Sequence, residues 1–309
     1  MKPQDSKNRA QSLSQTQEGA CGSLESLSTD LEKSSLKTEK EISFSQEQLK
    51  DIITKLERDI ADGSWLKGDY ANIDLKLMPA LIEQANRKHE GLNLKLATTS
   101  QEFISSIKET KDKGISSSRY IINKKDGGIH FAVIDHQNIG DQTSLIFFEP
   151  ATLNSVHTAM LALRTQMAVK SELPACHFSI AEIDIQRSNS ECGIFCLALA
   201  KKLHTNADKL TKMHQDNVNG VLCEPNTPLP SEKLDTYLPA SFYKHTQSSR
   251  RLEQYMKANP GAESEKVNKK EQTLRERFEK NAVKTENDKA VSVSPHKKRI
   301  REYNSLMMV

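Results

Sequence analysis

Apolar residues recur at helical spacing just after the point, near residue 43, where we expect the ordered part of the chain to begin. Steps of three and four residues relate most members of this series, which are Leu49, Ile52, Ile53, Leu56 and Ile60. Ser45, followed three residues later by Gln48, matches a capping box, and Asp62-Gly63 matches a helix stop. The pattern predicts an amphipathic helix between these two signals.

Residues 1–42 lack such a pattern. They are rich in Ser, Gln, Glu and Lys and contain few large apolar side chains. We expect this segment to be disordered, because it buries too little surface to offset its conformational entropy. It is interpreted either as a dispensable tail or as a secretion or targeting leader that stays unfolded.

The middle of the chain combines helical spacing with the two-residue alternation of strands. Helices are expected over 73–87, 102–111 and 154–170. Pro79 is expected to kink or restart the first of them. The helix over 154–170 is expected to have Val156, Met160, Leu163 and Met167 on one face. Strands are expected over 92–97, 120–122, 129–134, 144–148 and 178–185, with a turn at Lys125-Asp126-Gly127-Gly128. This mixture predicts an α+β core, with α/β as the alternative.

The C-terminal part differs in composition from this core. Prolines beyond residue 210 predict loops that wrap a surface, and they are Pro225, Pro228, Pro230 and Pro239. Residues 251–309 are highly charged and mostly helical in propensity, with basic clusters at Lys269-Lys270 and at His296-Lys297-Lys298-Arg299.

Overall composition excludes some classes of protein. The 309 residues contain 44 Lys and Arg against 41 Asp and Glu, and a net charge of +3 argues against a strongly basic nucleic-acid binder. Five cysteines without dense spacing favour a reducing compartment over a disulfide scaffold. The sequence has no run of about 18 apolar residues for a membrane span and no apolar region for a Sec-type signal peptide.

Cys192 is the candidate nucleophile. It lies between the expected strand over 178–185 and an expected helix over 194–203, after residues that often cap helices, Ser188, Asn189 and Ser190. The positive end of the helix dipole favours the thiolate, which is the nucleophilic form. Gly193 is expected to leave room for a substrate beside the sulfur. Cys196, one turn later, fits a small buried hydrophobic residue.

His130 and Glu149 have the residue types that a cysteine nucleophile needs as base and orienter. His130 lies in a strand between the small residues Gly128 and Ala132, and Glu149 ends an apolar strand. Taken singly, His130 fits a hydrogen-bonded structural histidine, and Glu149 fits a helix-terminal or surface acid. Gln186 is expected to offer an amide N–H to a developing oxyanion. No metal ion is expected.

A set of ordered motifs makes the chain, from about Ser45 to its C-terminus, resemble the YopJ/AvrA branch of the YopJ family of bacterial type III effector acetyltransferases. The motifs are Asp62-Gly63-Ser64-Trp65, Met78-Pro79-Ala80-Leu81, Gly127-Gly128-Ile129-His130-Phe131, Phe148-Glu149-Pro150-Ala151, Asp184-Ile185-Gln186-Arg187-Ser188, Glu191-Cys192-Gly193-Ile194-Phe195 and Phe242-Tyr243-Lys244-His245-Thr246. The resemblance implies a catalytic core like that of ubiquitin-like-protein proteases (the CE clan), with His130, Glu149 and Cys192 as its triad. It also implies a ping-pong transfer from acetyl-CoA through acetyl-cysteine to Ser, Thr and Lys of host kinases such as mitogen-activated protein kinase kinases.

The same resemblance implies activation by inositol hexakisphosphate, bound by a helical regulatory domain that flanking segments build. The expected division is a leader over 1–42, an N-terminal helical segment over 43–115, a catalytic core over 116–222 and a C-terminal regulatory segment over 223–309. Lys244 and His245 are the leading candidates for the polyphosphate site, and Lys244 is also a candidate for autoacetylation. Weaker candidates, which equally fit a solvated basic face, are Arg250, Arg251, Lys269, Lys270, Lys297, Lys298 and Arg299.

Two other functions remain open on sequence alone. A cysteine protease of ubiquitin-like modifiers would use the same triad with water as acceptor, although Phe131 stands where related proteases usually have Trp. An effector that only binds host kinases would keep its cellular effect after Cys192→Ala. The resemblance also implies delivery into the host cytoplasm through a type III secretion system, and neither a nucleic-acid partner nor stable membrane insertion is expected.

Overall fold

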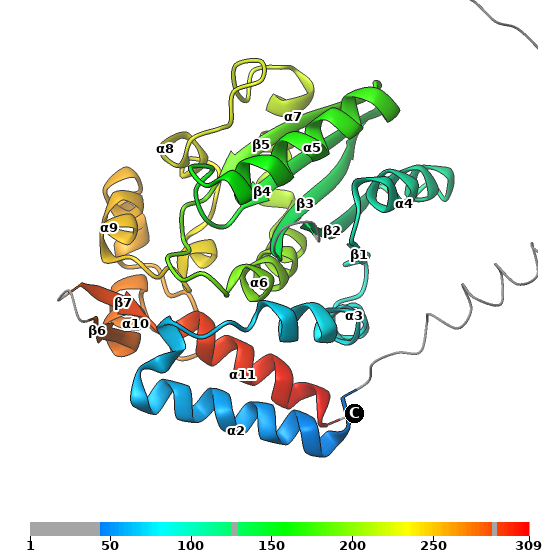
Figure 1. Cartoon of the computed structure of the whole chain (residues 1–309). Helices are drawn as coiled ribbons and strands as arrows, with labels where there is room; N and C mark the ends of the chain where they lie inside the picture. The colour runs from blue at the N-terminus through cyan, green and yellow to red at the C-terminus, as the bar shows by residue number, and fades with distance from the viewer. Residues whose placement is uncertain (1–43, 125–128, 286–288, 309) are drawn as a thin grey trace, which may run out of the picture. The chain divides into compact units, whose positions relative to one another are not determined.

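The N-terminal helix forms where the apolar spacing predicted it. The computed structural model describes residues 44–124, 129–285 and 289–308 (Figure 1). Helix α2 runs over Gln46–Asp62, and the capping box between Ser45 and Gln48 is present. Gly63 ends the helix with a φ of 79°, a left-handed conformation that glycine adopts without strain. The leader over 1–42 and the turn over 125–128 lie outside the described residues.

Helix α3, over Ala71–Lys88, continues through Pro79. The expected restart at Pro79 is therefore wrong. Tyr70 is the N-cap residue of α3. After α3 ends at Lys88, a short stretch without a helix leads into the sheet at Leu94.

A five-stranded mixed sheet forms the core of residues Phe44–Val309, which group as one compact unit. Its strands, in spatial and chain order, are β1 (Leu94–Ala97), β2 (Ser117–Lys124), β3 (His130–Ile139), β4 (Gln142–Glu149) and β5 (Cys176–Glu182). The outer pairs β1–β2 and β4–β5 are parallel, whereas β2–β3 and β3–β4 are antiparallel. The predicted mixture of helices and strands is confirmed.

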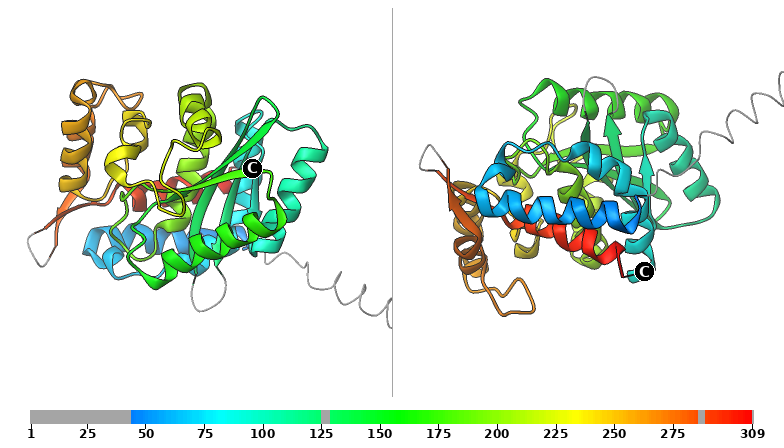
Figure 2. Two further views of the ribbon diagram at one scale, coloured as in Figure 1. Left: turned by 90° about the horizontal axis from the view of Figure 1, so that it is seen from above. Right: turned by 60° about the horizontal axis from the view of Figure 1, so that its bottom comes forward.

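Helices cover both faces of the sheet (Figures 1 and 2). One face packs against α4 (Ser100–Asp112) and α5 (Val156–Glu172), through side chains such as Ile134 and Phe147. The other packs against α6 (Cys192–Thr205) and α7 (Ala207–Val218), through the alternate residues Val133 and Phe148. Strands β3 and β4 thus present apolar side chains to two cores.

Helix α5 buries a different face from the expected one. Its buried positions are Thr158, Leu161, Ala162, Thr165 and Val169. Val156, Leu163 and Met167 are 74%, 47% and 62% exposed, so the expected apolar face is wrong as a core face. The choice between these two faces depends on the surface that the helix packs against and not on the helix alone.

The last of the C-terminal segments, α11, packs beside α2 and α3 (Figure 2). The C-terminal segments comprise α8 (Ser231–Leu234), α9 (Ser249–Ala258), α10 (Leu274–Asn281), the hairpin β6 (Ala282–Lys284) and β7 (Ala290–Ser292), and α11 (Ser294–Leu306). The helical propensity of residues 251–309 did not predict the β6–β7 hairpin. Short 3₁₀ turns lie at Ser64–Leu66, Ala240–Tyr243 and Pro260–Glu263.

The domain boundaries at 115 and 222 stay a prediction, although β1 and β2 pair across the first of them. Among the described residues, no helix has the length and apolar character that a membrane crossing needs.

Candidate active site and basic pocket

Cys192 is the first residue of α6, which confirms its expected place in the first helical turn. Its side chain is 1% exposed. The N-cap residue is Glu191, and no side chain caps the helix. The expected capping by serine is wrong, because Ser188 Oγ donates to Gln247 Oε1 and Ser190 Oγ donates to the Gly68 carbonyl. The helix N-terminus thus presents its backbone N–H groups next to the thiol.

His130 and Glu149 lie at adjacent strand ends beside this thiol. His130 begins β3, and its Nε2 lies 2.8 Å from Oε2 of Glu149, the last residue of β4. The second carboxylate oxygen, Oε1, accepts from the Ala151 backbone N–H at 3.0 Å, so both oxygens of this fully buried side chain have partners. His130 also hydrogen-bonds the Cys192 side chain. The three side chains therefore have the connectivity of a nucleophile, a base and an orienter.

The electrostatics of this group favour a protonated His130. Burial by itself lowers the pKa of His130, but hydrogen bonds to Cys192 and Glu149 and the charges of both partners raise it to about 10. The imidazole consequently holds a proton at neutral pH, between the Glu149 carboxylate and the Cys192 sulfur. A proton in this position is available to a leaving group.

Gly193 has a packing role that the sequence did not reveal. A Cβ at this position would lie 3.0 Å from Oδ2 and 3.1 Å from Cβ of Asp74, and 3.2 Å from Cε of Met78. These atoms belong to α3, so the missing side chain lets α3 pack against α6. The expectation that Gly193 opens space for substrate is wrong, because Asp74 and Met78 fill that space.

Gln186 lies in the loop between β5 and α6, and its amide is committed to that loop. Its Nε2 donates to the Ser188 carbonyl at 2.7 Å. Its Oε1 is buried and has no hydrogen-bond partner within the described part of the chain. Its role toward an oxyanion stays a prediction.

A second site is a basic pocket of about 1170 Å³ between the N-terminal and C-terminal helices. Its basic lining residues are Lys244, His245, Lys266, Lys269, Lys270, Arg277, Lys280, Lys297, Lys298 and Arg301. Glu57 is the one acid among the lining residues that the structure describes. The pocket brings together both leading candidates of the polyphosphate site and four of the weaker ones. Lys266, Arg277, Lys280 and Arg301 were missed, because isolated basic residues carry no local signal.

Three other candidates lie outside this pocket. Arg250 lines a separate cavity that also contains Glu182 and Asp184. Arg251 is 1% exposed and pairs with Asp235, with Nη1 2.8 Å from Oδ2. Arg299 is fully buried and pairs with two carboxylates. The expectation that these arginines offer free charge to a polyphosphate is therefore wrong for Arg251 and Arg299.

Lys244, a lining residue of the pocket, has a second lysine as its neighbour, Lys202, which does not itself line the pocket. Lys202 of α6 hydrogen-bonds Lys244. Burial, and then the charge of Lys244, lower the pKa of Lys202 to about 7. Burial, Lys298 and Arg277 lower the pKa of Lys244 to about 8. Both amines are thus partly neutral near physiological pH, and Lys202 was not expected from sequence.

His245 plays a different part. Its Nδ1 lies 2.8 Å from Oγ of Ser294, and burial lowers the pKa of this histidine well below its usual value. It links the 244–247 stretch to the start of α11 as a neutral side chain. Among the described residues, no group of three or more His, Cys, Asp and Glu side chains is placed to hold a metal ion.

Known proteins resemble this chain over most of its length. The family model described as YopJ Serine/Threonine acetyltransferase matches residues 49–305. The serine/threonine-protein acetyltransferase YopJ of Yersinia pestis is 52% identical over 275 residues, which cover 88% of this chain and 95% of YopJ. HopZ1a of Pseudomonas syringae pv. syringae, also a serine/threonine-protein acetyltransferase, is 26% identical over 242 residues, 68% of this chain and 64% of that protein.

Solved structures agree with these matches. AvrA delL154 with IP6 and CoA superposes with a TM-score of 0.81 at 50% identity, covering 85% of this chain and 99% of that one. HopZ1a in complex with IP6 and CoA superposes with a TM-score of 0.66 at 19% identity, covering 84% of this chain and 98% of that one, which supports the fold alone.

Proposed function

The chain belongs to the YopJ family of serine/threonine acetyltransferases, and from this premise we propose that it transfers acetyl from acetyl-CoA to Ser, Thr and Lys of host signalling kinases through Cys192. The observation that carries the proposal is the buried His130–Glu149 pair, which meets the thiol at the start of α6. The expected acceptors are mitogen-activated protein kinase kinases, where an acetylated hydroxyl can no longer be phosphorylated. Delivery by type III secretion into the host cytoplasm belongs to the same proposal.

In the first half-reaction the Cys192 thiolate attacks the acetyl carbonyl of acetyl-CoA, and the thioester bond to CoA breaks. His130, protonated at neutral pH, gives its proton to the departing CoA thiolate. Backbone N–H groups at the start of α6 are the proposed donors to the oxyanion. Gln186 stays a further candidate, and its Nε2 would first have to leave the Ser188 carbonyl. The products are acetyl-cysteine and CoA.

In the second half-reaction His130 acts as a base. Acetylation of Cys192 removes the thiolate charge, which is one of the causes that raise the pKa of His130. The neutral imidazole then takes the proton of an acceptor hydroxyl, whose oxygen attacks the acetyl-cysteine and restores the thiolate. Glu149 holds the ring throughout and balances its positive charge whenever the imidazole is protonated.

Inositol hexakisphosphate is the proposed activator, bound in the basic pocket. The lining concentrates lysines and arginines that mutually repel when the pocket is empty, and a polyphosphate offsets this repulsion. The relative at 50% identity is known with IP6 and CoA. Lys244 stays the candidate for autoacetylation, because a pKa of about 8 leaves part of this amine neutral and nucleophilic.

The experiment that tests this function is transfer of labelled acetyl from acetyl-CoA to a purified kinase kinase, with and without inositol hexakisphosphate. We expect label on the kinase kinase that requires the polyphosphate. The alternative, a protease of ubiquitin-like modifiers, would give no label on kinase or enzyme but would cleave a ubiquitin-like conjugate. Label independent of the polyphosphate would contradict the proposed activator.

Affinity of the pocket for a polyanion is expected to fall as pH rises. Lys202 and Lys244 are charged below about pH 7 and 8 respectively and lose their protons above these values. We expect binding of inositol hexakissulfate, whose own charge does not titrate in this range, to weaken by roughly 10-fold between pH 6.5 and 9. Titration calorimetry in buffers of different ionisation enthalpy would measure both the affinity and the proton uptake.

The matched variant is Lys202→Gln, which removes the more perturbed lysine and should flatten this pH dependence. Lysines with ordinary pKa values would stay charged to pH 9. An affinity that does not change over this range would contradict the role given to Lys244 and its neighbour Lys202 in the charge of the pocket.

A further inference from the structure

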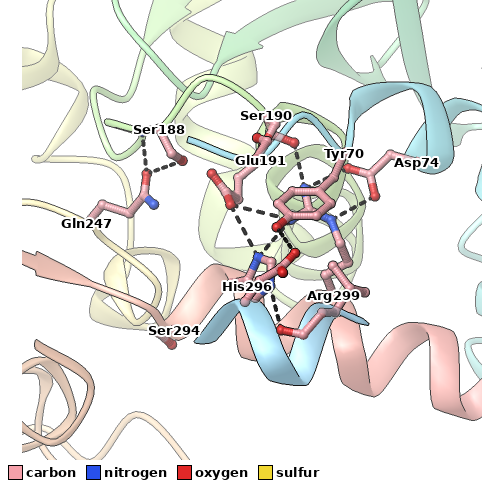
Figure 3. Close-up of polar contacts among 12 residues, drawn as sticks. Tyr70, Asp74, Ser188, Ser190, Glu191, Gln247, Ser294, His296 and Arg299 are labelled. Atoms are coloured by element: carbon pink, nitrogen blue, oxygen red, sulfur yellow. Dashed lines mark hydrogen bonds and ion pairs between the residues drawn. The ribbon is translucent and has the colours of Figure 1, made fainter. Parts of the chain in front are cut away.

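The loop that leads to the nucleophile, residues Gln186–Glu191 and here called the 186–191 segment, is held at its start by Gln247. The Oε1 atom of Gln247 accepts from the backbone N–H of Ser188 at 3.1 Å and from the Ser188 hydroxyl at 3.0 Å (Figure 3). It also accepts from the backbone N–H of Arg187 at 2.6 Å. Gln247 is fully buried, and its own backbone N–H donates to the Ile185 carbonyl. One side-chain oxygen thus fixes the backbone next to Gln186.

Gln247 is also connected to the basic pocket along the chain. Lys244 and His245, three and two residues earlier, line that pocket. The Arg277 guanidinium, a further lining group, donates to the Lys244 carbonyl at 2.7 Å and to Ser294 Oγ at 2.9 Å. A displacement of the pocket wall at Lys244 would therefore move the side chain that holds Ser188.

The end of the 186–191 segment is held by Arg299 of α11 (Figure 3). Its Nη2 donates to the Ser190 carbonyl, and its Nη1 lies 3.3 Å from Oε1 of Glu191, the residue before the nucleophile. Its Nε and Nη2 each lie 2.9 Å from an oxygen of Asp74, the side chain that packs against Gly193. A bidentate guanidinium fixes the direction as well as the distance of such contacts.

Arg299 also compensates charge behind the thiol. Asp74 and Glu191 are both fully buried, and Oε2 of Glu191 has no hydrogen-bond partner in the described part of the structure. Two uncompensated carboxylates next to Cys192 would oppose formation of a thiolate. The same helix, α11, places Lys297, Lys298 and Arg301 in the basic pocket.

We propose that Gln247 and Arg299 are positioning residues that hold the 186–191 segment at its two ends and transmit occupancy of the basic pocket to the geometry of Cys192. This inference rests on the proposed function, whose activator it connects to the thiol. In an empty pocket the cationic side chains of two walls repel each other, and these walls are the stretch at Lys244 and helix α11. The first wall leads to Gln247 and the second contains Arg299. A bound polyanion fixes both walls, and with them the approach to the nucleophile.

The test compares Gln247→Met and Arg299→Lys with wild type in the full chain. Met keeps the volume of Gln247 and loses the acceptor oxygen, whereas Lys keeps the charge of Arg299 and loses the bidentate fork. We expect kcat to fall by about 10- to 100-fold in each, as misplacement of a reacting group does. Calorimetric affinity for inositol hexakisphosphate should stay within about threefold of wild type, because neither side chain lines the pocket.

A second readout follows the thiol itself. The rate at which iodoacetamide alkylates Cys192 should rise with inositol hexakisphosphate in wild type and lose most of this response in both variants. Gln247→Glu, which restores an acceptor oxygen, should recover part of the response. This readout does not depend on acetyl transfer. If the wild type transfers no acetyl, the proposed function is overturned, and the alkylation rates alone then decide whether Gln247 and Arg299 are positioning residues.

The matched control is Arg251→Gln. Arg251 is an equally buried arginine of the C-terminal segment, paired with Asp235, and its contacts do not include the 186–191 segment. At temperatures where all variants stay folded, this control should keep the response of alkylation to the polyphosphate. If it loses the response as the two test variants do, or if those variants respond as wild type does, the positioning roles are overturned.

Discussion

Replacing Cys192 by alanine is expected to lower the rate of acetyl transfer by at least roughly 10⁴-fold, because no thiol then remains to carry the acetyl group from donor to acceptor. The change removes one sulfur atom from the first turn of α6 and leaves the fold intact, since Ala is a good helix former. Label on the enzyme itself, measured by intact mass after mixing with acetyl-CoA, should disappear at the same time.

The chain offers a matched control in Cys196. This thiol lies one turn further along α6 and is fully buried, and burial raises its pKa well above the usual range. Cys196→Ala should keep most of the activity once its stability has been checked by thermal unfolding. Equal losses in the two variants would indicate damage to α6 instead of loss of a nucleophile, and the assignment of Cys192 would not survive that result.

Replacing Glu149 by glutamine is expected to lower kcat by roughly 10³- to 10⁴-fold, the size of effect that loss of the orienting carboxylate has in related triads. Glutamine has nearly the same shape, but its amide cannot balance the imidazolium of His130 across the 2.8 Å contact. The KM for acetyl-CoA should change far less, because Glu149 is fully buried and reaches substrate only through His130.

The pH dependence of this variant has a definite sign. Glu149 raises the pKa of His130, which is about 10 in the wild type, so acetyl-enzyme formation by wild type should lose its acid at about that pH. In Glu149→Gln this alkaline limb should move to lower pH. Rapid-quench measurement of acetyl-enzyme formation between pH 6 and 10.5 would locate both limbs.

Glu182→Gln is the control for this second prediction. Glu182 lies directly beside Glu149 in the register of β4 and β5, but its carboxylate accepts from the Leu153 backbone N–H at 2.8 Å. We expect near wild-type kcat and an unmoved alkaline limb. A limb that moves equally in both variants would show a general field effect and not a specific role of Glu149.

Local sequence determined much of the architecture. Capping residues and apolar spacing located α2 to within a residue, and the strands that carry His130 and Glu149 were recognised from their alternating pattern. These signals act over three or four residues, where the chain's own geometry decides the outcome. The residue types alone left His130 open as a structural histidine, and the motif resemblance was needed to name the triad.

The tertiary structure decided which charged residues remain available. Arg299 belongs to the basic cluster at 296–299, yet it is buried against Asp74 and Glu191, whereas its neighbours Lys297 and Lys298 line the pocket. Asp74 lies more than two hundred residues away in the chain, so no local pattern reveals the pair. A buried charge requires a specific partner, and that partner is set by packing between distant elements.

The same reasoning applies to Gly193, Gln247 and the exposed face of α5. Each depends on what a second element places opposite it: Asp74 of α3 at Gly193, the backbone of Arg187 and Ser188 at Gln247, and the sheet surface beneath α5. Short-range preferences therefore determined the elements and the chemistry of the nucleophile. Long-range packing determined which of the many cations serve a pocket, which hold the catalytic segment, and which only stabilise the fold.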